Sequence, residues 1–324
     1  MREYTVGRND AGQRLDRFIG KVEPGLSPAL LQKTLRKKDV KINGRPARGD
    51  ARLAEGDQVR IYLTEEFFGA ERRKSLPAQE QKVELDIAYE DGNILVADKR
   101  PGVLCHDAGG AWSGGTLIAQ IQTYLRQKGE WDPRRENSFA PALCNRIDRN
   151  TGGLVIAAKN AAALRVMDGK IKNREIEKTY LCAVLGSPRP AAGRLEGYLF
   201  KDAKKNQVYV YDAPRPGALT AATEYRTLST AGELSLLECR LITGRTHQIR
   251  AQMAHAGWPL LGDGKYGVEK KNRAYGEKRQ LLHSYRLHFA FREDGGELNY
   301  LNGVTVQGSV PAFAEKYFRW QESC

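Results

Sequence analysis

The chain of 324 residues is 41% hydrophobic and 28% charged, a balance typical of folded globular proteins, and its length suggests two domains. Its 52 Lys and Arg against 39 Asp and Glu give a formal charge of +13, which favours a nucleic acid partner over an anionic membrane surface. The sequence has no apolar run of about 18 residues and no basic-then-apolar leader. We therefore expect a cytoplasmic protein with neither a transmembrane span nor a signal peptide.

The cysteines exclude two further classes of protein. They are odd in number, widely scattered and never form a Cys-x-x-Cys pair: Cys105, Cys144, Cys182, Cys239 and Cys324. This spacing argues against a disulfide framework and against a zinc knuckle. We expect small buried side chains instead.

Residues 1–63 are predicted to form a small α/β module. Leu15, Phe18 and Ile19 have helical spacing, and Ser27-Pro28 has the pattern of an N-cap followed by a proline at the first helical position. From residue 40 the apolar period changes to two, and Asn43-Gly44 is typical of a tight hairpin. A further strand is predicted at 59–63. This core is too small for a catalytic domain.

The module carries concentrated positive charge. Between Leu31 and Arg48 one acid, Asp39, faces seven basic residues: Lys33, Arg36, Lys37, Lys38, Lys41, Arg45 and Arg48. Such a cluster can neutralise several phosphates of a nucleic acid, although a solvated basic face is the alternative. The two helices and hairpin, with RLDRFI and later LRKKDVKINGRPA, resemble the αL-type RNA-binding module first described in a small-subunit ribosomal protein.

Residues 64–82 lack periodicity and are predicted to be a linker, so that a second domain covers 83–324. Strands are predicted at 94–96, 154–158, 180–185, 207–211, 234–241, 287–291 and 304–306. Helices are predicted at 116–126, 161–171, 246–255 and 312–320. This pattern predicts an α+β fold with a mixed, mostly antiparallel sheet.

Several common sites are absent from the sequence. There is no phosphate-binding loop of the NTPase kind and no Gly-x-Ser-x-Gly elbow. A Gly-x-Gly-x-x-Gly match at 262–267 neither leaves a strand nor opens an apolar helix, which argues against a dinucleotide site. His247 and His255 lie eight residues apart, too far to share a small ion on one helix. We therefore expect no metal site.

Two polar clusters remain as candidates. In NRIDRNTGGLV, Asp148 lies between Arg146 and Arg149 before a Thr-Gly-Gly turn. In LITGRTHQIRAQMAHA, Arg245 lies at the start of a predicted helix, whose positive end attracts anions. Each cluster alone also fits a salt-bridged turn or an ordinary capped helix.

Taken together, NRIDRNTGGLVIAAK, EKTYLCAV and LITGRTHQIRAQMAHAGWPLLGDGKYG resemble the RluA-type family of RNA pseudouridine synthases over most of residues 83–320. The family's first motif is His-Arg-Leu-Asp-Arg-x-Thr-Ser-Gly. This chain has Asn145, Ile147 and Gly152 where that motif has His, Leu and Ser. The departures flank the retained Asp148, so they put substrate contacts in doubt more than catalysis.

The resemblance implies a pseudouridine synthase-like fold and a cofactor-free isomerisation of uridine to pseudouridine in RNA, with large-subunit ribosomal RNA favoured. It implies Asp148 as the catalytic aspartate, Tyr180 as the active-site tyrosine and Arg245 as the basic partner of the aspartate. Arg146 is implied to occupy the space left by a flipped base. Arg149 and the basic residues of the module are expected to contact RNA.

Two alternatives stay open at this point. A non-catalytic RNA-binding protein would explain the charge but needs none of the three motifs. A metal hydrolase that uses His247 and His255 has little support from their spacing. We expect a monomer, and the sequence does not indicate which uridine is modified.

Overall fold

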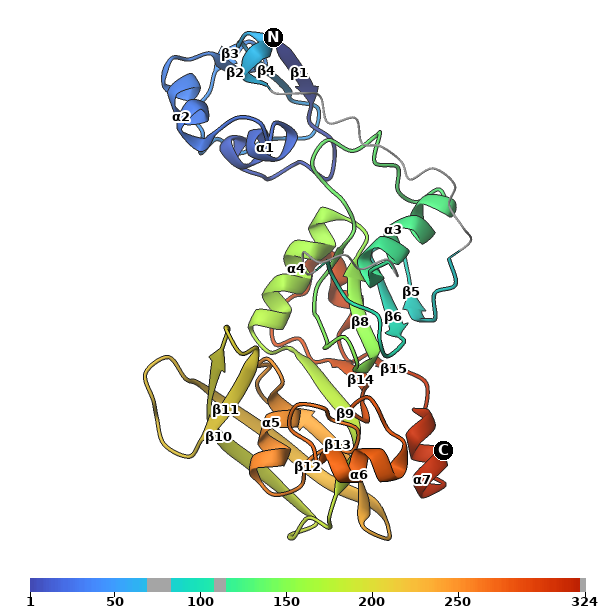
Figure 1. The fold of residues 1–324 in the computed structure, drawn as a ribbon. Coiled ribbons are helices and arrows are strands. Elements are labelled where there is room, and N and C mark those ends of the chain that lie inside the picture. Colours follow the sequence, from blue (N-terminus) through green and yellow to red (C-terminus); the bar gives the residue numbers. More distant parts are fainter. Residues whose placement is uncertain (69–82, 108–114, 321–324) are drawn as a thin grey trace. The chain divides into compact units, whose positions relative to one another are not determined.

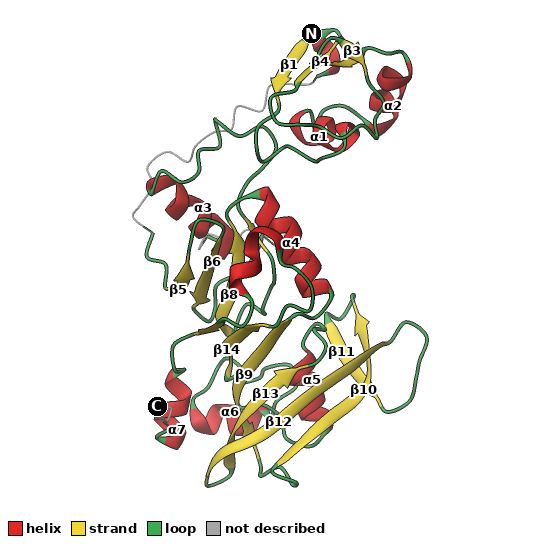
Figure 2. Ribbon diagram, turned by 180° about the vertical axis from the view of Figure 1, so that it is seen from behind, coloured by secondary structure: helices red, strands yellow, loops and turns green. Residues whose placement is uncertain are grey.

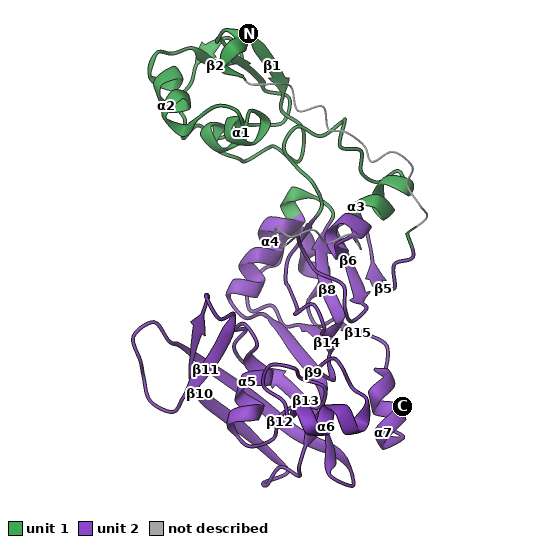
Figure 3. Cartoon of the chain, in the orientation of Figure 1, with its two compact units in different colours: residues 1–83, 122–141, 159–162 green, residues 84–121, 142–158, 163–324 purple. Residues whose placement is uncertain are grey.

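The computed structural model describes residues 1–68, 83–107 and 115–320. The chain divides into two compact units (Figure 3). Unit 1 comprises residues 1–83, 122–141 and 159–162, and unit 2 comprises residues 84–121, 142–158 and 163–324. The sequence-based domain borders at 63 and 83 stay a prediction, and most of the predicted linker, residues 69–82, lies outside the described residues.

Residues 1–63 of unit 1 form two helices and a four-stranded sheet. The helices are α1 (Leu15–Val22) and α2 (Pro28–Arg36), and the sheet has the order β1 (Arg2–Thr5), β4 (Gln58–Ile61), β2 (Val40–Ile42) and β3 (Arg45–Pro46). The Ser27 hydroxyl accepts a hydrogen bond from Leu30 N–H at 3.2 Å, so Ser27 is the predicted N-cap of α2. Asn43 and Gly44 both have positive φ, as the tight turn between β2 and β3 requires.

The later segments of unit 1 are held to the N-terminal residues by polar contacts. Ser138 donates to Asp10 Oδ1 at 2.6 Å, and Asn137 donates to Asp10 Oδ2 at 2.8 Å. Asn9 donates to Glu136 at 2.8 Å. A short 3-10 helix, η1 (Glu65–Phe67), lies in the first part of the predicted linker.

Unit 2 is built on an eleven-stranded sheet (Figures 1 and 2). Its main path runs β11 (Gln207–Tyr211), β10 (Ala192–Asp202), β12 (Leu219–Ala231), β13 (Leu234–Leu241), β9 (Ile176–Leu185), β14 (Leu282–Phe289), β8 (Gly152–Ala158), β6 (Ile94–Lys99) and β5 (Ile87–Glu90). Off this path, β15 (Thr305–Gln307) pairs with β14, and β7 (Ala142–Leu143) pairs with β8. The pairing of β14 with β8 is parallel, and the other pairings are antiparallel. The predicted α+β class with a mixed, mostly antiparallel sheet is confirmed.

Helices lie beside this sheet (Figure 2). They are α3 (Leu117–Gln127), α4 (Ala161–Lys172), α5 (Gln248–His255), α6 (Glu269–Tyr275) and α7 (Ala312–Phe318), with a 3-10 helix η2 (Gly296–Leu301). Ile249 and Met253 of α5 join Tyr180 and Cys182 of β9 in one buried core. This packing brings the start of α5 to the part of the sheet where β9 carries Tyr180.

Candidate active site

A cleft of about 760 Å³ lies in unit 2 and brings together three of the predicted segments. Its walls include the loop around Asp148, the side chain of Tyr180 on β9 and the turn before α5 with Arg245. These residues are widely separated in the chain. The sequence motifs therefore meet at one place, which their order alone could not show.

The Asp148 loop joins β7 to β8 and is fixed by neighbouring residues. Ile147 packs against the core around Tyr180, and the Asp148 carbonyl accepts a hydrogen bond from Thr151 N–H at 3.1 Å. The buried Asn145 side chain accepts a hydrogen bond from Ile156 N–H at 2.8 Å through Oδ1. Asn145 thus ties the start of the loop to β8, which gives this departure from the RluA-type motif a structural role. The Asp148 side chain remains 26% exposed toward the cleft.

The two glycines after Thr151 serve different steric needs. Gly153 has φ of 103°, and a Cβ there would collide with the Ser284 carbonyl of the paired strand β14, so only glycine fits. A Cβ on Gly152 would lie 2.8 Å from Nδ1 of His283 and 3.1 Å from Pro101. His283 therefore fills the space that a serine at 152 would need.

Lys99, at the end of β6, holds the Asp148 loop through hydrogen bonds to backbone carbonyls. Its side chain is buried, and Nζ donates to the carbonyls of Arg100 at 3.1 Å, Val103 at 2.9 Å and Arg149 at 3.0 Å. The Arg149 carbonyl also accepts Gly102 N–H at 2.8 Å. Burial lowers the pKa of Lys99 to about 8, although Cys105 and Asp148 act to raise it.

Arg250, in the first turn of α5, is the basic partner of Asp148. Its Nη1 donates to Asp148 Oδ2 at 2.7 Å. Its Nε and Nη2 donate to the two carboxylate oxygens of the fully buried Asp263 at 2.7 and 2.9 Å. Burial acts to lower the pKa of Arg250, but the two carboxylates outweigh it and raise that pKa. The guanidinium therefore stays charged and bridges both acids.

The prediction that Arg245 pairs with Asp148 is wrong. Arg245 precedes α5, and its Nε donates to the Thr220 carbonyl at 3.1 Å. It lines the cleft, but its guanidinium is directed to β12. The motif GRTHQIR contains both arginines, and the arginine on the buried side of the helix is the one that reaches the aspartate.

Buried amides set the position of α5. Gln248 accepts hydrogen bonds from Thr243 Oγ1 at 2.8 Å and from Arg245 N–H at 3.0 Å. It donates to the Ala222 carbonyl at 3.0 Å. Gln252, one turn later, donates to the Leu195 carbonyl at 3.1 Å. These bonds fix the helix to the sheet and so direct Arg250 toward the cleft.

The glycine-rich segment 262–267 is a support for Arg250. Asp263 Oδ1 accepts Lys265 N–H at 2.9 Å and Tyr266 N–H at 3.1 Å, which closes the turn around the carboxylate. A Cβ at Gly262 or Gly267 would collide with neighbouring carbonyls. The sequence pattern gave no indication of this support, because it depends on the contact of Asp263 with Arg250.

Tyr180 lies on β9 opposite Ser284 of β14, and its side chain is 6% exposed. Burial raises the pKa of Tyr180 to about 12, while the Ser284 hydroxyl acts in the opposite direction. The phenol is therefore neutral at physiological pH. An aromatic ring and a charge-paired carboxylate thus line one cleft, an arrangement suited to a flat, uncharged ring bound beside an acid.

Comparison with known proteins decides the family. A family model described as RNA pseudouridylate synthase matches residues 93–255. A protein of Mycoplasma genitalium named as an uncharacterized RNA pseudouridine synthase is 32% identical over 292 residues, covering 89% of this chain and 88% of the relative. The chain belongs to the RNA pseudouridylate synthase family. It is an RNA pseudouridine synthase, and the resemblance to the RluA type is confirmed.

Other similar proteins agree. An uncharacterized RNA pseudouridine synthase of Bacillus subtilis is 29% identical over 287 residues, with 89% of each chain covered. A protein of Neisseria meningitidis serogroup A named ribosomal large subunit pseudouridine synthase D is 29% identical, covering 91% of this chain and 77% of the relative. The solved structure titled human RNA pseudouridylate synthase domain containing 1 shares the fold, with a TM-score of 0.57 at 20% identity over 74% of this chain and 89% of that one.

His247 is a further polar residue in the cleft of the synthase. It has a left-handed backbone with φ of 52°, directly before α5, and its side chain is 10% exposed. Nδ1 lies 2.9 Å from the Tyr266 hydroxyl, and Nε2 lies 3.9 Å from Asp148 Oδ2. In the sequence, its spacing from His255 suggests only the role of a metal ligand, so the position of His247 beside Asp148 comes from the structure.

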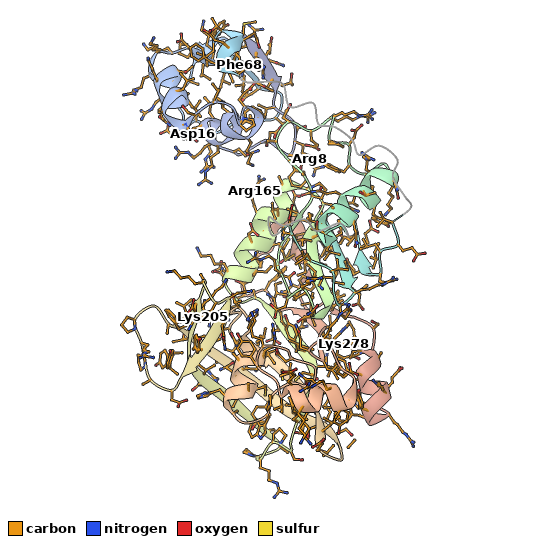
Figure 4. The ribbon with its side chains drawn as sticks, viewed as in Figure 1. Arg8, Asp16, Phe68, Arg165, Lys205 and Lys278 are labelled. Carbon is orange, nitrogen blue, oxygen red and sulfur yellow. The ribbon has the colours of Figure 1, made fainter. Side chains whose placement is uncertain are left out.

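The remaining predicted contact residues are on the surface of the synthase. Arg146 is exposed at the edge of the cleft, and Arg149 Nε donates to the Gly102 carbonyl at 3.2 Å. In unit 1, Lys41 lies with its Nζ 4.9 Å from the Tyr62 ring centroid. The other basic residues predicted to bind RNA are exposed on and after α2: Lys33, Arg36, Lys37, Lys38 and Arg45. Figure 4 shows the side chains of both units, with Lys205 labelled in the turn between β10 and β11.

No group of three or more His, Cys, Asp or Glu in 1–68, 83–107 and 115–320 is arranged to hold a metal ion. Over the same residues, no helix has the length and apolar character needed to cross a membrane. Cys105, Cys182 and Cys239 are buried free thiols, and Cys144 is partly buried.

Proposed function

We propose that this synthase isomerises specific uridines of large-subunit ribosomal RNA, with Asp148 as its catalytic carboxylate. The observation that carries the proposal is the 2.7 Å charge-assisted hydrogen bond from Arg250 to Asp148, in a cleft that Tyr180 also lines. The choice of RNA rests on relatives named as ribosomal large subunit pseudouridine synthases in Neisseria meningitidis and Xanthomonas campestris.

The reaction balances within the nucleotide. The C1′–N1 bond breaks with its electron pair on the uracil ring, the ring turns over, and C5 bonds to C1′. C5 loses its proton and N1 gains one, so the isomerisation needs no oxidant, reductant or external energy. Asp148 acts at the ribose or at the ring, and either path needs an oriented carboxylate. Arg250 supplies the orientation because it is itself fixed by both oxygens of Asp263.

Tyr180 is proposed to pack against the flipped uracil. Because its pKa is raised to about 12, the phenol enters the reaction in its protonated form. It can then offer a ring face and a hydroxyl that donates a hydrogen bond. If the hydroxyl also assists proton removal from the ring, the proton must pass on to a second acceptor.

The base must leave its stack to enter the cleft, which costs a few kcal/mol. Arg146, two residues before Asp148 and exposed, is proposed to occupy the vacated space in the RNA, and Arg149 to contact the backbone beside it. A protein that merely binds RNA would need neither the Asp148 pairing nor the buried support of Arg250.

Residues 1–63 are proposed to be an αL-type RNA-binding module that adds affinity through phosphate contacts. The side chains of Lys33, Arg36, Lys37 and Lys38 are exposed, and they follow one another along the end of α2 and the adjoining turn. Contacts of this kind add affinity without reading sequence. The module would thus strengthen binding while the cleft selects the uridine.

The test is an Asp148→Asn variant assayed on cellular RNA that carries tritium at uracil C5 and comes from cells lacking the synthase. We expect loss of tritium release with RNA affinity retained, because the amide keeps the volume of the carboxylate but not its charge. Asp212→Asn is the matched control, since Asp212 is an exposed acid paired with His255. Wild-type turnover by Asp148→Asn would disprove the catalytic assignment. Mapping of pseudouridines in RNA from the same cells would identify the target, and a site outside large-subunit RNA would disprove the choice of substrate.

A further inference from the structure

The protonation of His247 follows from its hydrogen-bonding partners. The Tyr266 hydroxyl accepts a hydrogen bond from Val208 N–H at 2.8 Å, and its other polar contact in the described chain is His247 Nδ1 at 2.9 Å. A hydroxyl has one proton to donate. With Val208 as a fixed donor, Tyr266 satisfies both contacts when it donates to an unprotonated Nδ1. The imidazole proton is then on Nε2.

The Nε2 proton has no acceptor within the described residues. The nearest carboxylate oxygen, Asp148 Oδ2, is 3.9 Å away, beyond hydrogen-bonding distance, and it already accepts Arg250 Nη1. His247 nevertheless lines the cleft. A donor in this position is directed at the space that the reacting nucleotide would occupy next to Asp148.

The surroundings also favour a neutral imidazole. Burial lowers the pKa of His247, and although Asp148 and Asp263 act to raise it, Arg250 and Lys265 act in the same direction as burial. The imidazole is also held in place by the edge-to-face contact of its ring with Tyr266, at 5.7 Å between centroids. The left-handed backbone of His247 directs the side chain into this position before the helix begins, and such backbone strain is common at functional sites.

We propose that His247, neutral and protonated at Nε2, donates a hydrogen bond to a carbonyl oxygen of the target uracil and stabilises the charge that the ring acquires during glycosidic cleavage. When C1′–N1 breaks, the electron pair is delocalised from N1 onto the two carbonyl oxygens. A fixed N–H donor favours that charge without transferring a proton. The hydrogen bond becomes weaker again when C5 bonds to C1′ and the ring loses its negative charge. The inference rests on the proposed function, because it places the uracil beside Asp148.

The experiment compares His247→Phe with His247→Gln in single-turnover tritium release from the RNA described above. Phenylalanine keeps the ring volume without a donor, whereas the glutamine amide places an N–H near the position of Nε2. Loss of one such donor costs on the order of 10² to 10³ in rate. We expect that loss for His247→Phe with RNA affinity within about twofold of wild type, and at least a tenfold recovery for His247→Gln. Wild-type turnover by His247→Phe, or equal losses in both variants with weakened RNA binding, would overturn the proposal.

Two further measurements separate the donor role from a structural one. Nitrogen-15 NMR of histidine-labelled enzyme should show His247 protonated at Nε2, assigned by its absence in His247→Gln, and a proton on Nδ1 would overturn the proposal. Tyr266→Phe should lower the rate, because Nδ1 of His247 then loses its donor and can take the imidazole proton. An unchanged rate would show that Tyr266 does not fix the proton on Nε2.

His255→Phe is the matched control, since His255 lies at the opposite end of α5 from His247 and is hydrogen-bonded to Asp212. Asp148→Asn is assayed in parallel. If Asp148→Asn is inactive and His247→Phe is fully active, only the role of His247 fails. If Asp148→Asn turns over, the proposed function fails first.

Discussion

Arg250 donates one hydrogen bond to Asp148 and two to Asp263, so a single guanidinium joins the exposed acid of the cleft to a buried one. The two acids have different roles. Asp263 is fully buried, and it fixes the plane of the guanidinium, whereas Asp148 faces the cleft and can reach a substrate. This relationship leads to a prediction that separates stability from activity.

Arg250→Met should abolish activity and lower the free energy of unfolding. The stability loss should be about 3 to 5 kcal/mol, because Asp263 is left as a buried unpaired charge. The double variant Arg250→Met/Asp263→Asn should recover part of the stability but none of the activity. Urea unfolding and single-turnover assays measure the two effects. Arg245→Met is the matched control, with little stability change expected, and equal stability losses in both arginine variants would contradict the assignment.

Much of the fold was predictable because burial leaves a pattern in the sequence. β11 and β13 have the predicted bounds, and α4 differs from its prediction by one residue. The long strands β10 and β12 were missed because charged and polar residues interrupt their apolar positions, and because exposed residues alternate with less exposed ones in the first half of β10. A search for continuous apolar runs does not detect such strands.

The site was predictable only in part for a different reason. The motifs indicated Asp148 and Tyr180 as candidates, but the partner of Asp148 depends on the rotation of α5. That rotation is set by the hydrogen bonds of Gln248 and Gln252 to β12 and β10, which are tertiary contacts. The roles of Asn145 and Asp263 also depend on contacts to residues distant in the sequence.

Lys99 should make the stability of the synthase depend on pH. Its pKa is about 8 in the folded chain and about 10.5 when unfolded, so between these values the unfolded chain binds a proton that the folded chain lacks. The contribution of the neutral Lys99 side chain to the free energy of unfolding is therefore fully present above about pH 10.5, and it is lost as the pH falls to about 8. Relative to Lys99→Met, wild-type stability should rise by about 1 kcal/mol per pH unit from pH 8.

Urea unfolding at pH 7.5 and pH 9.5 measures this difference. The Lys99→Met variant should also lose catalytic rate, because three carbonyls around the Asp148 loop lose their shared donor. Lys172→Met on α4 is the control, since that lysine is exposed. A stability difference between wild type and Lys99→Met that stays constant over this range would contradict the lowered pKa.

Gly152→Ser should destabilise this enzyme even though serine is the usual residue at that position in the RluA-type motif. The new Cβ would lie 2.8 Å from His283 Nδ1, and overpacking of this kind costs about 1 to 3 kcal/mol. The double variant Gly152→Ser/His283→Ala, in which the His283 side chain is shortened, should recover most of the lost stability. A double-mutant cycle measured by thermal unfolding tests the coupling. Additive effects of the two substitutions would show that His283 is not the reason for glycine at 152.

The basic residues of α2 should determine the salt dependence of RNA binding. Each phosphate contact removed lowers the slope of log affinity against log salt by about 0.7 to 0.9. Replacing Lys33, Arg36 and Lys37 by glutamine should therefore reduce the slope by up to about 2 to 3. The single-turnover rate measured with saturating enzyme should stay unchanged, because Asp148 and Arg250 are intact. Filter binding at several salt concentrations gives the slope. The matched control replaces Arg194, Arg226 and Arg240 by glutamine, which changes the net charge by the same amount. These arginines are paired with acids on the sheet surface. Equal slopes for the two triple variants would show that net charge, rather than the α2 cluster, attracts the RNA.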